Sequence, residues 1–114
     1  MKITWIVGMA MLVGNFSVGA AEFTKAQKSK IEEAVKDRLS DPDSAKFKFP
    51  PYKGGDVYCG TVNAKNKMGG YVGFSPFQIF VLSGGKSFML IGVGGDESSS
   101  YVLNKSCDDA GYSL

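Results

Sequence analysis

Few residues of this sequence have the type and spacing that catalysis needs, and histidine is absent. Imidazole is the usual general base near neutral pH, so its absence removes most catalytic triads and most zinc sites. One histidine-free pattern is present, because Ser83-Gly84-Gly85-Lys86 matches S-x-x-K. That motif works when one helical turn places serine and lysine on the same face. Two glycines between apolar runs predict a hairpin turn instead.

The acidic residues form no catalytic or cation-binding pattern. Asp108 and Asp109 are adjacent, so an extended backbone would point them to opposite sides. The acids at positions 41, 43 and 96 lack the dense spacing of a calcium loop. We therefore expect a protein that is not an enzyme and that holds neither cofactor nor metal. A small wall- or glycan-acting enzyme that uses carboxylates is kept as an alternative.

The beginning of the sequence predicts export. Lys2 precedes a mostly apolar run from Ile3 to Val13, and small residues follow at Val18-Gly19-Ala20. This order is typical of a secretory signal peptide over residues 1–20, cleaved after Ala20 or Ala21. The apolar run is shorter than the roughly 20 residues that span a bilayer, so no stable membrane anchor is expected after cleavage. The predicted location is periplasmic or secreted.

Residues 21–114 then form one small domain with nearly balanced charge. Loss of Lys2 leaves 12 of the 13 basic residues against 11 acidic ones, so the basic excess that nucleic acid requires is missing. The chain has two cysteines, Cys59 and Cys107. In an oxidising compartment such a pair is expected to form a disulfide. Two free thiols are the alternative, but the sequence has neither Cys-x-x-Cys spacing nor a histidine that could lower a thiol pKa.

Two different periodicities divide the domain. Residues 23–39 repeat apolar positions at helical spacing, with Thr24 and Gln27 placed for a capping box, and Pro42 marks the stop. Further along, alternation and apolar runs predict strands. The expected strands cover residues 45–49, 56–64, 77–82 and 88–93, with a last one beginning at Tyr101 after a flexible polar loop over 94–100.

These elements predict an α+β fold. One N-terminal amphipathic helix would pack on an antiparallel sheet of four or five strands, so that each element hides its apolar face. The disulfide would join the last strand or tail to the second strand. An all-β barrel with an appended helix is the alternative.

Two sequence blocks carry a resemblance. The stretches "LSDPDSAKF" at 39–47 and "CGTVNAKNKMGGYVGFSPF" at 59–77 resemble a pattern found in small exported bacterial and prophage-encoded proteins of unknown function. The pattern reads LxDPxSAxF and then CGxVNAKNxxGGYxGFxxF, and it covers about a third of the mature chain. The resemblance implies no activity and no catalytic residue.

The second block contains the candidate binding site. Its glycines and asparagines predict a hairpin connection, since these residues tolerate positive φ. A tyrosine among amides and cations is also good contact chemistry. The candidate residues are Asn63, Lys65, Asn66, Lys67 and Tyr71. The expected function is non-enzymatic binding of another envelope or secreted protein, as an inhibitor, immunity or exclusion factor does. A glycan-binding module with exposed Tyr52, Tyr58 or Tyr71 is the other alternative.

Overall fold

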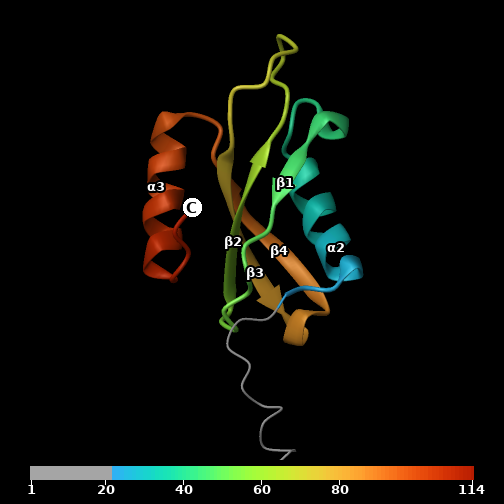
Figure 1. Cartoon of the computed structure of the whole chain (residues 1–114), viewed down its shortest axis with the longest axis vertical. Coiled ribbons are helices and arrows are strands. Elements are labelled where there is room, and N and C mark those ends of the chain that lie inside the picture. Colours follow the sequence, from blue (N-terminus) through green and yellow to red (C-terminus); the bar gives the residue numbers. More distant parts are fainter. Residues whose placement is uncertain (1–21) are drawn as a thin grey trace, which may run out of the picture.

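The computed structural model describes residues 22–114, which form a four-stranded antiparallel sheet with a helix on each side (Figure 1). The expected signal peptide over 1–20 lies outside the described residues. Within residues 22–114 no helix has the length and apolarity to cross a bilayer. The elements in chain order are α2 (Lys25–Lys36), η1 (Pro42–Ser44), β1 (Lys46–Lys48), β2 (Val57–Asn63), β3 (Ser75–Leu82), η2 (Ser83–Gly85), β4 (Ser87–Val93) and α3 (Glu97–Asp109).

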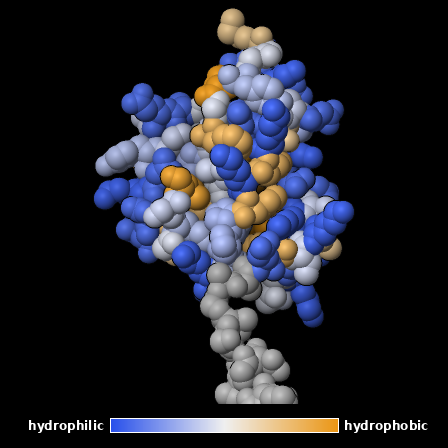
Figure 2. Space-filling model, in the orientation of Figure 1, coloured by the Kyte–Doolittle hydropathy of each residue, from blue (hydrophilic) through white to orange (hydrophobic). Residues whose placement is uncertain are grey.

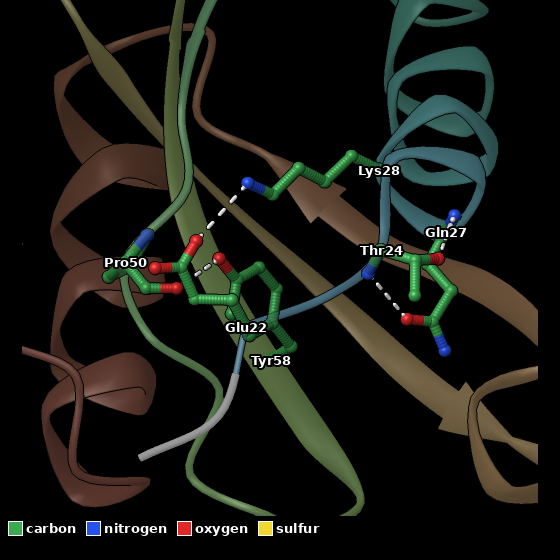
Figure 3. Close-up of polar contacts among 6 residues, drawn as sticks. All are labelled: Glu22, Thr24, Gln27, Lys28, Pro50 and Tyr58. Carbon is green, nitrogen blue, oxygen red and sulfur yellow. Dashed lines mark hydrogen bonds and ion pairs between the residues drawn. The ribbon is translucent and has the colours of Figure 1, made fainter.

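Helix α2 begins at the predicted capping box. The Thr24 side chain accepts a hydrogen bond from the amide of Gln27, and the Gln27 side chain accepts one from the amide of Thr24 (Figure 3). These bonds satisfy two donors that would otherwise lack partners in the first turn. The helix buries Ile31 and Val35. It ends at Lys36, before the expected stop at Pro42, which instead opens the short helix η1.

The sheet is a simple meander in the order β1-β2-β3-β4. Its register places Tyr58 opposite Ile79 and Gly60 opposite Phe77. Because side chains alternate along a strand, these four residues share the face covered by α2. We call this side the α2 face. The opposite side carries Cys59 and Gln78 and is covered by α3; we call it the α3 face.

The core on the α2 face is built from aromatic rings. The ring of Phe23 lies 4.8 Å from that of Tyr58 and 5.4 Å from that of Phe88, both edge-to-face. Such pairs add about 0.5–1.5 kcal/mol to the gain from burial. Tyr58 is fully buried, and its hydroxyl donates to the Pro50 carbonyl at 2.6 Å (Figure 3). Burial raises the pKa of Tyr58 far above its ordinary value, with smaller contributions from Tyr112 and Glu22.

Helix α3 corrects the prediction for the end of the chain. The expected strand from Tyr101 is wrong, and so is the flexible loop beyond Asp96, because Glu97–Asp109 is one helix. Asp96 caps it through the amide of Ser99, and this hydrogen bond, followed by the one from the Ser99 hydroxyl, lowers the pKa of Asp96. Ser98, Ser99 and Ser100 lie in the polar first turn of this helix. Leu103 and Cys107, one turn apart, face the sheet.

The disulfide prediction is confirmed, with a different partner element. Cys59 of β2 and Cys107 of α3 are joined, with Cα atoms 5.9 Å apart. The bond therefore attaches a helix, not a strand or tail, to the centre of the sheet. The sheet has four strands, at the lower end of the expected number.

The β3–β4 hairpin is also as predicted. Ser83-Gly84-Gly85 forms a tight turn in which Gly84 and Gly85 have φ of 65° and 94°. Strand β3 is covered on both faces only in its first half, since Phe77 to Ile79 are buried while Phe80 and Leu82 are exposed. The expectation of a doubly covered strand thus holds for the part beneath α3.

Replacing both cysteines by alanine is expected to destabilise the fold strongly. The bond closes a loop with a sequence separation of 48, for which chain entropy gives about 4 kcal/mol. Chemical denaturation of the oxidised protein and the double variant measures this difference. Hydrogen exchange should show larger losses of protection in α3 than in α2. Equal unfolding midpoints would contradict the expectation.

Alanine at position 60 is expected to destabilise the sheet by about 1–3 kcal/mol through overpacking. A Cβ there would lie 2.6 Å from the ring of Phe77 and 2.7 Å from the carbonyl oxygen of Lys48. The ring could shift, but the Lys48 oxygen belongs to the neighbouring strand backbone. Gly55→Ala is the matched control, because nothing lies within 4 Å of its Cβ position. Thermal melts should show a loss only for the first variant.

Candidate functional site

The connection between β2 and β3 projects beyond the end of the sheet, and we call residues 64–74 the arm (Figure 1). Lys65 and Tyr71 pair across it as an isolated antiparallel bridge. Beyond them a tight turn closes, with the amide of Asn66 donating to the Gly70 carbonyl at 2.9 Å and that of Gly69 to the Asn66 carbonyl at 3.0 Å. The predicted hairpin connection is therefore present.

The two asparagine side chains of the candidate site hold the backbone of the arm. The side-chain oxygen of Asn66 accepts hydrogen bonds from the amides of Met68 and Gly70. That of Asn63, at the end of β2, accepts one from the amide of Gly73 at 3.2 Å. Such local bonds are the usual reason for asparagine in turns. The geometry gives both residues a structural role.

Ser44 of η1 attaches the arm to the body of the domain. Its hydroxyl accepts a hydrogen bond from the amide of Lys65, and its carbonyl accepts one from the Tyr71 hydroxyl, both at 2.8 Å. Ser44 and Tyr71 belong to the two separate blocks "LSDPDSAKF" and "CGTVNAKNKMGGYVGFSPF". These blocks therefore meet in space, although 27 positions separate the two residues.

Lysines lie over the aromatic rings at the base of the arm. The Nζ atom of Lys46 lies 4.7 Å from the ring centre of Tyr71, and that of Lys65 lies 5.8 Å from it. Lys48 belongs to β1, as Lys46 does, and its Nζ atom lies 4.1 Å from the ring centre of Phe74. An exposed cation–π contact is worth about 0.5–1 kcal/mol. The contacts hold three positive charges close to two rings.

The arm presents apolar side chains to solvent. Met68 at the tip is 93% exposed, and Val72 near the base is 70% exposed. Lys67 is exposed beside Met68. Figure 2 shows hydrophobic residues gathered below the projecting arm, between hydrophilic ones. The arm thus combines a backbone fixed at its base with an apolar tip.

The structure brings the five predicted site residues together on one connection, but it divides their roles. Asn63, Asn66 and Tyr71 make hydrogen bonds that shape the arm. Lys65 lies over the ring of Tyr71, and the exposed Lys67 presents its charge to solvent. Sequence reasoning missed the exposed tip residues and the lysines of β1. The alternation Lys46-Phe47-Lys48 is typical of a half-buried strand, but only the fold reveals that rings of the arm lie beneath the two lysines.

The structure also places the residues that the alternative chemistries would use. Tyr58, expected as an exposed platform for sugars, is buried, and Tyr52 is stacked on Phe23 with ring centres 4.5 Å apart. Ser83 and Lys86 lie at the two ends of the β3–β4 turn, in which Gly84 departs from helical φ and ψ. Among residues 22–114 no three acids, cysteines or histidines gather in a way that could hold a metal.

Removing the Ser44 anchor is expected to loosen the arm without unfolding the domain. Ser44→Ala deletes the acceptor for the Lys65 amide, and Tyr71→Phe deletes the donor to the Ser44 carbonyl. A typical hydrogen bond contributes about 0.5–1.5 kcal/mol, so global stability should fall only slightly. Hydrogen exchange at the amides of Lys65 to Tyr71 should accelerate. Ser113→Ala is the control, and unchanged protection in the arm of both variants would refute the anchor.

Comparison of the chain with protein-family models, with curated proteins and with solved structures found no match. The function must therefore be inferred from the arm and from the surfaces beside it.

Proposed function

We propose that this chain is an exported, non-enzymatic binding protein that contacts another protein through the arm. In this proposal the signal peptide over 1–20 is removed, and α2 becomes the N-terminal helix of a mature domain formed by residues 21–114. The partner is an envelope or secreted protein met in the periplasm or outside the cell. An inhibitor, an immunity factor or an exclusion factor would act in this way.

The observation that carries the proposal is the exposure of Met68 on an anchored arm. A large apolar side chain that is 93% exposed gains free energy if a partner covers it, because burial of apolar area is worth about 25 cal/mol per Å². Methionine is enriched in protein interfaces. Since the base is tied to Ser44, little backbone entropy would be lost on binding.

The disulfide supports the expected compartment. A cross-link between Cys59 and Cys107 forms and persists in oxidising surroundings, which agrees with the predicted export. The domain is small, and small exported domains commonly supplement a limited core with disulfides.

Affinity capture tests the proposal. The oxidised protein is used as bait in an envelope extract, and the captured protein is then purified and bound in isolation. Met68→Ser should weaken this binding about tenfold or more, because central apolar contacts are each worth over about 1 kcal/mol.

The matched control is Met89→Ser, which alters a methionine that is 52% exposed on β4, outside the arm. It should leave the affinity unchanged. An equal loss of affinity in both variants, or no loss of affinity in Met68→Ser, would show that the arm is not part of the binding site.

A further inference from the structure

A groove of about 290 Å³ lies at the base of the arm. Three segments that are distant in sequence form its walls: residues 38–40 after α2, both ends of the arm, and residues 93–95 between β4 and α3. Figure 1 shows all three at the same end of the sheet. The volume is near the lower limit of ligand pockets, which run from about 300 to 1,000 Å³. It suits a short group and not a folded surface.

The charges of the groove have one sign. Arg38 and Lys65 are among its lining residues, and no lining residue is acidic. In the described part of the chain, neither cation takes part in an ion pair. Asp37 and Asp41 flank the 38–40 segment in sequence but do not line the groove. Two cations without a carboxylate between them favour an anionic ligand.

Part of the wall is apolar. Leu39, Val72 and Val93 line the groove beside polar residues such as Ser40 and Ser75, and Val62 lies almost fully buried behind them. An inorganic anion would gain nothing from such a surface. A carboxylate attached to a carbon that bears an apolar side chain could pair with the cations while that side chain packs on the apolar residues.

Three glycine amides beside the groove already have acceptors. The amides of Gly94 and Gly95 donate to the Pro76 carbonyl and to the Ser99 hydroxyl, and that of Gly73 donates to Asn63. The cationic side chains of Arg38 and Lys65 supply the charge that would recognise an anion. Asn66 can add a donor, because its side-chain oxygen already serves two amides and its NH₂ group remains.

We propose that this groove binds the C-terminal carboxylate of a partner polypeptide whose last residue is apolar. The carboxylate pairs with Arg38 and Lys65, and the last side chain packs on Leu39, Val72 and Val93. A chain end is the best match because its carboxylate and its side chain leave the same carbon, so a small groove can hold both. This inference rests on the proposed function, since it assigns the partner's chain end to the base of the arm.

The test uses two short peptides that differ in one group. The ¹⁵N-labelled oxidised protein is titrated with acetyl-Gly-Gly-Leu as the free acid, with the same peptide as its C-terminal amide, and with inorganic phosphate. The free acid should shift the amide signals of Lys65, Gly73 and Gly95 saturably. The amide should bind about tenfold more weakly or worse, since a hydrogen bond to a charged group is worth about 1.5–3 kcal/mol.

Arg38→Gln should weaken binding of the free-acid peptide about tenfold, because it also removes a hydrogen bond to a charged group. Lys105→Gln on α3 should leave this binding unchanged. Lys65→Gln provides a second variant if the spectrum of Arg38→Gln shows altered folding. Equal binding of acid and amide would overturn the proposal, and so would phosphate binding as tightly as the acid.

The two proposals can fail separately. If Met68→Ser abolishes partner capture but the peptides do not bind, the arm remains the contact and only the groove assignment fails. If the free acid binds and capture is indifferent to Met68→Ser, the groove stands and the arm does not.

Discussion

The covalent link between Cys59 and Cys107 is the constraint on which the second layer of this fold depends. Helix α3 buries only one residue completely, the half-cystine itself, whereas α2 buries Ile31 and Val35. Its other ties to the sheet are modest, such as the 2.9 Å hydrogen bond from Gln78 to Ser106. A contribution of about 4 kcal/mol is large beside the 5–15 kcal/mol that stabilise a typical domain. The bond can thus compensate for the small apolar face of α3.

The sheet itself depends on a close approach of a different kind. Gly60 leaves room for the ring of Phe77 and for the backbone of β1, so three strands and an aromatic core can meet at one point. The same strand supplies Cys59 to the other face. Because side chains alternate, adjacent residues of β2 therefore serve both layers, the aromatic core under α2 and the cross-link to α3.

Local signals in the sequence predicted much of this fold. Residue types that act over a few positions predicted the capping box at Thr24 and the β3–β4 turn. The pairing of Cys59 with Cys107 followed because the chain has no other cysteine. Helix α3 was missed because serines fill its first turn and few apolar residues mark its buried stripe. Its capping box of Asp96 and Ser99 was a readable signal, obscured because serine and not glutamate occupies the third helical position.

The arm was predicted as a connection, but the roles of its residues depend on contacts that no local pattern specifies. Tyr71 was expected to meet a partner freely, yet its hydroxyl is bound to Ser44 and its ring lies beneath Lys46. Arg38 and the groove could not be predicted, because their positions require three segments of chain to converge. The sequence predicted the hairpin connection that the structure has, but not the contacts that fix its side chains.

The division between a fixed base and an exposed tip has a physical consequence for binding. An unanchored loop of this length would lose backbone entropy of about 1–2 kcal/mol for each residue ordered on binding, which would cancel the gain from covering one methionine. The two hydrogen bonds to Ser44 and those accepted by the Asn66 side chain order the arm when the domain folds, so this entropy is not lost again on binding. The lysines held over Tyr71 and Phe74 add positive charge at a defined place at the base of the arm. A partner suited to this surface would offer an apolar hollow with negative charge on one side, and a free carboxylate at a chain end supplies that charge within reach of the groove.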